Sequence, residues 1–244
     1  MSTFRVDGPA AAGYTAAIRA FSRVCRVLAP LFGVAVVACA SGIQPVHGPV
    51  SPDLEREAVQ ATAPDRPLRI IFDWTVRERD ARFQGQGAAR VQDPYRARLD
   101  LFGPRGETYL SAAVVDGDIR LPASVSPSVV PPAPLLWSAL GVLRPPVGAT
   151  LVGTARDGDR VRLEYRDAGG QWRFELVAGR LRRAEWIRSD GSRQSVELKG
   201  EGALRLPREA VYRDWAAYTE LTLTLDEVEP VDAFPPETWS PQAG

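Results

Sequence analysis

From residue 68 onward, hydrophobic and polar residues alternate with a period of two, which is typical of β-strands with one buried and one solvated face. The clearest runs are Ile70–Val76, Val161–Tyr165, Trp172–Leu176 and Leu221–Leu225. Dipeptides that favour tight hairpin turns separate many of the runs: Asp116-Gly117, Asp157-Gly158, Gly169-Gly170, Ala178-Gly179 and Asp190-Gly191. The pattern predicts a mainly β protein with about ten or eleven antiparallel strands in a meander, forming a closed or nearly closed sheet.

Two segments have a helical pattern instead. Ser51-Pro52-Asp53 reads as an N-cap, a first-turn proline and a first-turn acid, and it predicts a short helix ending near Thr62. Residues 133–143 are apolar on nearly every side and lie between prolines. A helix of this kind must be covered by other elements, so we expect it on the concave face of the curved sheet. The long loop before it, residues 123–130, suits a lid connection.

The N-terminal residues resemble a bacterial lipoprotein signal. Arg19, Arg23 and Arg26 precede an apolar run that ends in Val36-Val37-Ala38-Cys39. The run, of about 12 residues, is shorter than the roughly 20 that a membrane-spanning helix needs. We expect residues 1–38 to be removed, Cys39 to be lipidated and thus to anchor the protein in a membrane, and residues 39–51 to form a flexible tether. A non-lipidated secretory signal and an uncleaved anchor helix are the alternatives.

Composition narrows the function classes. The chain has 30 basic and 30 acidic side chains, and loss of the predicted signal leaves 26 and 29, so we expect no nucleic-acid partner. The expected domain, residues 52–240, contains no cysteine, and the single histidine, His47, falls in the tether. A disulfide framework, a thiolate nucleophile, a His-containing catalytic triad and a Cys- or His-based metal centre are therefore excluded, and we expect no metal and no cofactor.

Several motifs together resemble one family. Trp74 with Gly85 and Gly87, followed by the run from Arg98 to Gly106, resembles the opening segment of the LolA/LolB-like superfamily of bacterial periplasmic proteins and outer-membrane lipoproteins. Residues 228–239 are similar to the terminal strand and aromatic-ended tail of that family. The resemblance covers most of residues 52–240. It implies an unclosed antiparallel β-barrel with short helices on its concave face, where members hold acyl chains, and it carries no catalytic signature.

A wide, half-closed barrel of this kind has room for a hydrophobic ligand. The residues that we expect to line the cavity are Phe72, Trp74, Leu99, Leu136, Trp137, Leu140, Trp172 and Phe174. The alternative is that they pack against one another as core. Arginines of the opposite strand parity are expected to form a solvated face paired with Glu164, Glu175 and Glu185: Arg160, Arg162, Arg166, Arg173, Arg182 and Arg188.

Hydrolytic chemistry would have to rest on paired carboxylates. The acids on or near strands, Asp100, Glu164, Glu175, Glu185 and Glu197, lie among arginines, so we expect no enzyme. Two hypotheses remain. The first is a monomeric carrier or acceptor that binds a lipid or an acylated protein and is anchored through Cys39. We expect it at the outer membrane, facing the periplasm, because Ala40 follows the cysteine in place of the acidic residue that commonly signals inner-membrane retention in proteobacterial relatives. The second is an interaction lipoprotein that docks a protein partner in an envelope complex.

Overall fold

The computed structural model describes residues 42–241, so the predicted signal and Cys39 lie outside the described residues. Twelve antiparallel strands form one sheet, which is not closed. The first five strands are β1 (Leu68–Glu78), β2 (Ala81–Gln92), β3 (Arg96–Phe102), β4 (Thr108–Val115) and β5 (Asp118–Arg120). The other seven are β6 (Thr150–Asp157), β7 (Arg160–Asp167), β8 (Gly170–Val177), β9 (Arg180–Arg188), β10 (Arg193–Lys199), β11 (Glu209–Asp214) and β12 (Thr219–Pro230).

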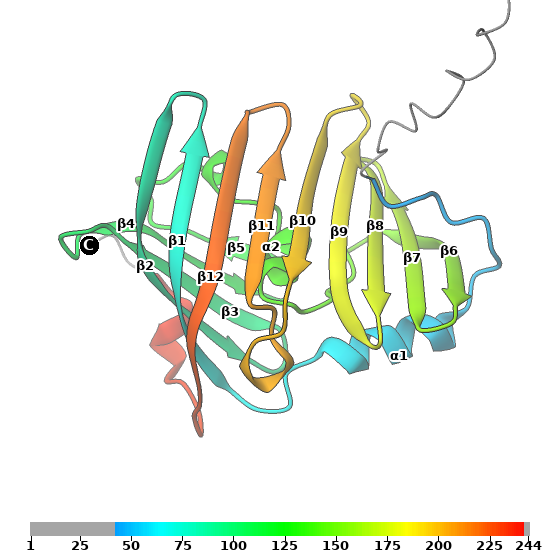
Figure 1. The fold of residues 1–244 in the computed structure, drawn as a ribbon, viewed down its shortest axis with the longest axis horizontal. Coiled ribbons are helices and arrows are strands. Elements are labelled where there is room, and N and C mark those ends of the chain that lie inside the picture. The colour runs from blue at the N-terminus through cyan, green and yellow to red at the C-terminus, as the bar shows by residue number, and fades with distance from the viewer. Residues whose placement is uncertain (1–41, 242–244) are drawn as a thin grey trace, which may run out of the picture. The chain divides into compact units, whose positions relative to one another are not determined.

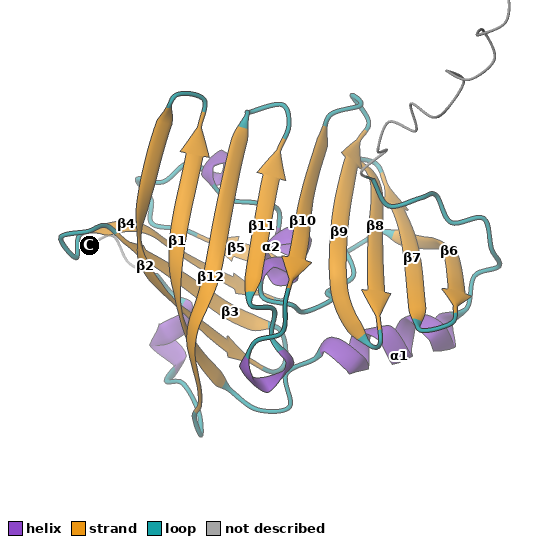
Figure 2. Cartoon of the chain, in the orientation of Figure 1, coloured by secondary structure: helices purple, strands orange, loops and turns teal. Residues whose placement is uncertain are grey.

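The helices are short. The two α-helices are α1 (Pro52–Thr62) and α2 (Ala133–Ala139), and the 3-10 turns are η1 (Pro127–Val129), η2 (Ala203–Arg205) and η3 (Pro236–Trp239). Within residues 42–241, no helix combines the length and apolar character needed to cross a membrane. Figure 2 shows how little of the domain is helical and that α2 lies inside the curve of the sheet.

The strand order is β5-β4-β3-β2-β1-β12-β11-β10-β9-β8-β7-β6, so the fold consists of two meanders joined by the pairing of β1 with β12. The predicted single meander is correct within each half but misses this joint. The segment that contains α2 carries the chain from β5 at one edge to β6 at the other. Figure 1 shows the sheet bending so that β3, β4 and β5 lie behind β1 and β12. Twelve strands exceed the predicted ten or eleven.

Strand β1 confirms the predicted alternation, because Leu68, Ile70, Phe72, Trp74 and Val76 are all buried while their neighbours are not. Its register explains the two glycines of β2. Trp74 lies opposite Gly85 and Phe72 opposite Gly87. A Cβ on Gly85 would lie 1.9 Å from the carbonyl oxygen of Phe102, and a Cβ on Gly87 would lie 2.3 Å from the Phe72 ring. Gly87 therefore makes room for the Phe72 ring, and Gly85 for the Phe102 carbonyl and the Trp74 indole nitrogen beside it.

Both predicted helices are present. The Ser51 hydroxyl accepts a hydrogen bond from the Leu54 amide at 3.3 Å and caps α1 as expected. Helix α2 ends at Ala139, earlier than the predicted Leu143, because Gly141 adopts a left-handed conformation with φ +79°. The amides of Gly141 and Val142 donate to the carbonyls of Ser138 and Trp137, which is the Schellman arrangement.

Candidate functional site

All eight residues expected to line a ligand cavity are buried in one hydrophobic cluster on the inner side of the sheet. Leu136, Trp137 and Leu140 come from α2 and the residue after it, and the other five come from strands. Trp74 donates its indole N–H to the carbonyls of Gln86 and Phe102, both at 3.0 Å. Trp172 stacks on Trp186 with ring centroids 4.7 Å apart.

Helix α2 packs against the concave face of the sheet, and three cavities lie along it. The largest has a volume of about 360 Å³ and opens at the end of the sheet where α1, η2 and the turn between β8 and β9 lie. Two apolar gaps of about 30 and 20 Å³ follow it between α2 and the strands. Leu140 lines all three cavities, and neighbouring cavities share further residues, so they form one row.

The row of cavities uses half of the expected lining residues. Leu140 touches every cavity, Phe72 lines the first gap, and Leu99 and Leu136 line the second. Trp74, Trp137, Trp172 and Phe174 line none of the three and pack within the core. The indole N–H of Trp137 is buried and has no hydrogen-bond partner among the described residues, a cost of about 1–3 kcal/mol for a group removed from water.

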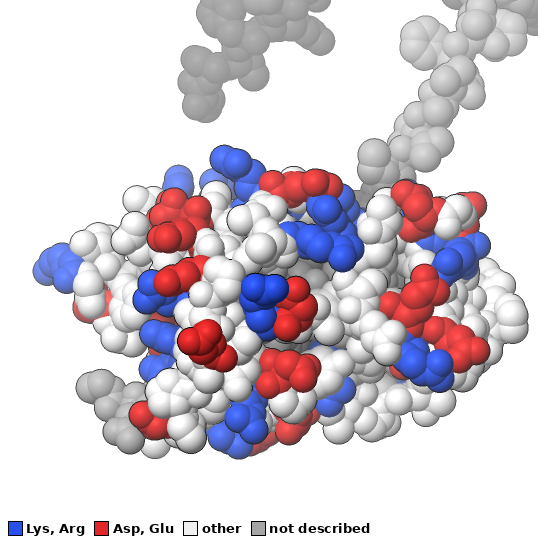
Figure 3. Space-filling view, turned by 90° about the horizontal axis from the view of Figure 1, so that it is seen from below, with Lys and Arg blue, Asp and Glu red and all other residues white. Residues whose placement is uncertain are grey.

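The large cavity is amphipathic. Its apolar wall comprises Leu68, Val91, Leu140, Val142, Leu181 and Leu206. Its polar residues include Gln60, Asp65, Arg180, Arg182 and Arg205. Arg180 pairs with Glu201 at 2.6 Å, whereas Arg182 and Arg205 form no ion pair within residues 42–241. Figure 3, which views this end of the domain from below, shows basic and acidic side chains interspersed over the surface.

The sequence pattern contains no signal that groups the positive side chains of this cavity. The alternation places Arg182 on the polar face of its strand, and Arg205 lies in η2, where Leu204 and Arg205 both have positive φ, at 51° and 66°. This local backbone conformation, which non-glycine residues rarely adopt, places Arg205 at the cavity. No periodicity in the sequence predicts such a turn.

Two buried tyrosines lie on the inner side of the sheet. Burial, followed by its hydrogen bond to Glu55, holds the pKa of Tyr165 well above its ordinary value, and its hydroxyl donates to Glu55 Oε1 at 2.8 Å. Burial, with a smaller effect of the Asp214 charge, also raises the pKa of Tyr212, which lines the second apolar gap. Both phenols therefore stay neutral to a higher pH than an exposed tyrosine does.

The outer face of β7, β8 and β9 differs from the expected solvated face. Glu164 pairs with Arg173 at 3.1 Å, as expected, but Glu164 is only 5% exposed and Glu185 only 1%. Residues 42–46, expected to be flexible tether, cover them. Ile43 N–H donates to Glu185 Oε2 at 2.8 Å and Val46 N–H to Glu164 Oε2 at 3.1 Å. The expectation of a solvated face is wrong here, because a strand's wet side can equally be covered by another chain segment.

The carboxylates considered for hydrolytic chemistry all have a basic neighbour. Each of the five has an arginine nitrogen within 3.5 Å: Asp100 with Arg90 and Arg98, Glu164 with Arg173, Glu175 with Arg160, Glu185 with Arg183, and Glu197 with Arg213. Asp100 also accepts a hydrogen bond from the Ser111 hydroxyl at 2.6 Å. All five carboxylates therefore form ion pairs on the outer face of the sheet.

Comparison with known proteins identifies the fold. No family model matches the sequence, and no curated protein matches it. A LolA superfamily protein from Nitrosomonas europaea matches with a TM-score of 0.53 at 13% identity, over 78% of this chain and 96% of that one. A putative outer membrane lipoprotein-sorting protein domain from Vibrio parahaemolyticus matches with a TM-score of 0.45 at 8% identity, over 77% and 94% of the chains.

A DUF1329 family protein from Desulfovibrio piger gives a TM-score of 0.45 at 8% identity, over 77% of this chain and 95% of that one. Of these three structures, only the first exceeds a TM-score of 0.5, and at 13% identity it shows the fold alone. The chain therefore has a LolA-like fold.

Proposed function

We propose that this chain is an envelope lipoprotein, anchored through Cys39, that binds an acyl chain of a lipid or of an acylated protein in the cavity beside α2. The observation that carries the proposal is the row of three cavities that share Leu140. The largest, at about 360 Å³, falls within the range of roughly 300–1,000 Å³ typical of ligand pockets. The row continues from there into apolar gaps along the helix.

The chemistry of the large cavity fits an amphiphile. Its apolar wall suits methylene groups, each of which contributes about 0.8 kcal/mol on burial, so ten would supply about 8 kcal/mol before entropic costs. Arg182 and Arg205 offer positive charge to an anionic or zwitterionic head at the polar side. A free fatty acid, a phospholipid and a lipoprotein's acyl chains share this chemistry.

Helix α2 is the element whose displacement would extend the cavity. Gaps lie between it and β1, β11 and β12, and its Trp137 N–H lacks a partner among the described residues. It has only seven residues, and its connection to β5 includes the irregular stretch before Pro132. A shift of α2 would join the two small gaps to the large cavity without breaking any strand pairing.

The test is native mass spectrometry with lipid extraction on residues 40–244 exported behind a cleavable signal. This segment includes every contact described above, because the compact unit begins at Gly42. We expect co-purifying acyl lipid. Ala63→Trp, at an exposed position on the cavity wall, should reduce it, whereas Ala168→Trp, at an exposed turn away from the cavity, should not. Equal lipid in both variants would place the ligand elsewhere.

Lipid-free protein with unchanged folding would favour the second function, docking of a protein partner. The edge of β6 gives that alternative a physical basis, because β6 pairs only with β7 among the described strands, although residues 46–51 contact it at Gly153 and Thr154. An unpaired edge can accept an extended peptide as an added strand. Lipid extraction therefore separates the two functions directly.

A further inference from the structure

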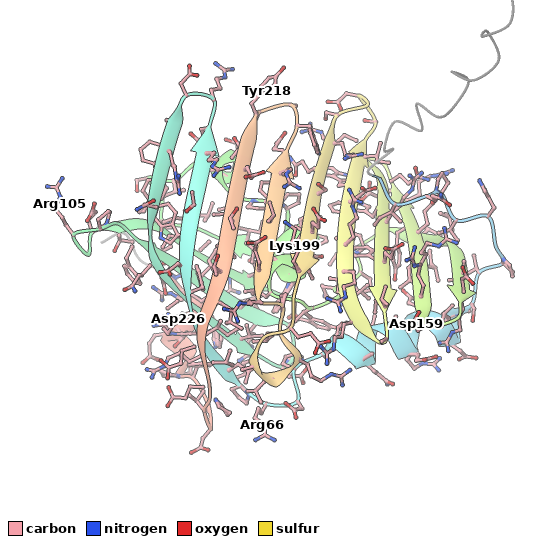
Figure 4. The ribbon with its side chains drawn as sticks, viewed as in Figure 1. Arg66, Arg105, Asp159, Lys199, Tyr218 and Asp226 are labelled. Atoms are coloured by element: carbon pink, nitrogen blue, oxygen red, sulfur yellow. The ribbon has the colours of Figure 1, made fainter. Side chains whose placement is uncertain are left out.

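One end of the sheet carries exposed aromatic side chains on a well-ordered hairpin. The turn between β11 and β12 presents Trp215, 49% exposed, and Tyr218, 71% exposed. Figure 4 shows Tyr218 projecting outward from the tip of this hairpin. Asp214 Oδ1 accepts hydrogen bonds from the amides of Ala216 and Ala217 at 2.9 and 3.0 Å. The turn is therefore held in shape while its aromatic side chains remain in solvent.

The same end is where the described chain begins. The Trp215 amide donates to the Arg193 carbonyl at 3.1 Å, and the Arg193 guanidinium lies 5.1 Å from the Trp215 ring centre. A Cβ placed on Gly42 would lie 3.2 Å from Arg193 Nη1. Gly42, Arg193 and Trp215 are thus neighbours, and together with Tyr218 of the same hairpin they make up the end of the sheet that we call the aromatic edge.

The first described residues are fastened at this place. Glu185 and Glu164 accept hydrogen bonds from the amides of Ile43 and Val46, and Arg173 Nη1 donates to the Ile43 carbonyl at 3.0 Å. These three contacts hold the main chain to the outer face of the sheet. The first described residue, Gly42, is consequently held beside the aromatic edge.

Only a short stretch of chain separates Cys39 from Gly42. Cys39 precedes Gly42 by three residues, and a fully extended chain spans at most about 3.6 Å per residue, or about 11 Å in total. An acyl anchor on Cys39 therefore brings the aromatic edge to the bilayer surface. Tryptophan and tyrosine favour the interface between lipid and water, where an apolar ring and a polar group are both satisfied. The arginine stem beside them can lie along the apolar region with its charge in water.

We propose that the aromatic edge is a membrane-contact surface that rests in the lipid headgroup region and fixes the orientation of the domain. The inference rests on the proposed lipidation of Cys39. The charges at this end are nearly balanced, since it carries Arg188 and Arg193 together with Asp190 and Asp214, and Arg188 lies 3.7 Å from Asp190. Recognition is therefore through the aromatic side chains, and zwitterionic lipid is sufficient.

The orientation has a consequence for the cavity. Strand β9 runs from Arg180, on the wall of the large cavity, to Arg188, beside the aromatic edge. Eight steps at about 3.3 Å separate these residues by about 26 Å. The membrane-contact surface and the cavity opening thus lie at opposite ends of the strands.

The experiment measures tryptophan quenching in full-length lipoprotein reconstituted into phosphatidylcholine vesicles whose lipids carry bromine at shallow acyl positions. Five of the six tryptophans are buried or half-buried, so Trp215 is the one open to lipid. We expect emission to fall relative to unbrominated vesicles, and Trp215→Phe to remove most of that loss. The control is Arg66→Trp in the Trp215→Phe background, because Figure 4 places Arg66 at the opposite end; its tryptophan should not be quenched.

Two results would overturn the inference. One is equal quenching with and without Trp215, and the other is quenching of the tryptophan at position 66 as strong as that of Trp215. Mass spectrometry of the same sample and flotation with vesicles separate this failure from that of the anchor. Acylated, floating protein without Trp215 quenching refutes the aromatic edge alone, whereas protein without acyl chains that fails to float refutes both.

Discussion

Replacing Glu185 with alanine tests whether residues 42–46 belong to the folded domain. Glu185 is 1% exposed and accepts the Ile43 N–H at 2.8 Å, and Arg183 Nε lies 3.1 Å from its other oxygen without the alignment of a hydrogen bond. Glu185→Ala leaves the Ile43 amide without its acceptor and Arg183 without its carboxylate. It also releases residues 42–46, whose first residue approaches the aromatic edge.

The expected loss follows from these contacts. Removing one member of a buried ion pair costs about 3–5 kcal/mol, and an amide left without a partner alone accounts for about 1–3 kcal/mol of this. We therefore expect Glu185→Ala to lower the free energy of unfolding by about 3–5 kcal/mol. With a urea m-value of about 2 kcal/mol/M, the midpoint should fall by about 2 M.

The assay is urea unfolding followed by circular dichroism, together with hydrogen exchange of the Ile43 and Val46 amides. Both amides should be protected in the natural protein and exchange rapidly in the variant, while strand β12 keeps its protection. The matched control is Glu197→Ala. Glu197 pairs with Arg213 at 3.2 Å but is 41% exposed at its side chain, so the loss should stay below about 1 kcal/mol. Equal midpoints for the two variants, or an unprotected Ile43 amide in the natural protein, would refute the reasoning.

Two further predictions concern the core. Trp74→Ala should cost about 3–5 kcal/mol of unfolding free energy, because it empties a buried aromatic site and removes the donor to Gln86 and Phe102; an unchanged thermal melt would contradict this packing. The raised pKa of Tyr165 and of Tyr212 means that the unfolded chain loses these protons near pH 10 while the folded chain keeps them, so stability is full below pH 10 and falls as pH rises further. Above pH 10, the free energy of unfolding should fall by about 2.7 kcal/mol per pH unit for the two tyrosines together, and by about half of that in Tyr212→Phe. A urea midpoint that does not change between pH 10 and 11 would refute this prediction.

The elements of the fold are largely predictable because each depends on local physics. Alternation identifies β1, the turn dipeptides identify the hairpins, and Ser51 with Pro52 identifies the start of α1. Residues 133–143 are apolar on nearly every side, which correctly predicts that α2 is covered. Strand β5 is not predictable in this way, because three residues are too few to show a period.

The site is less predictable because it depends on which segments meet. Alternation is the same whether the polar face of a strand meets water or another segment, so the burial of Glu164 and Glu185 under residues 42–46 has no signature of its own. The order of the strands is likewise set by the pairing of β1 with β12, in which Trp74 lies opposite Leu223, 149 positions further along the chain. Hydrophobicity identifies the buried residues but does not separate those that line a gap, such as Leu140, from those that pack solidly, such as Phe174.

The two proposals together set a direction for exchange. With the aromatic edge on the bilayer, the cavity opens away from the membrane that holds Cys39, about 26 Å along β9. A ligand can then enter from the aqueous side, but its delivery to the same bilayer requires the domain to tilt or release the membrane. The domain can move away from the membrane only as far as the segment between Cys39 and its first fixed residue reaches. The hydrogen bonds of the Ile43 and Val46 amides keep that segment short. Variants that free residues 42–46, such as Glu185→Ala, should therefore change the orientation on the membrane without changing the lining of the cavity.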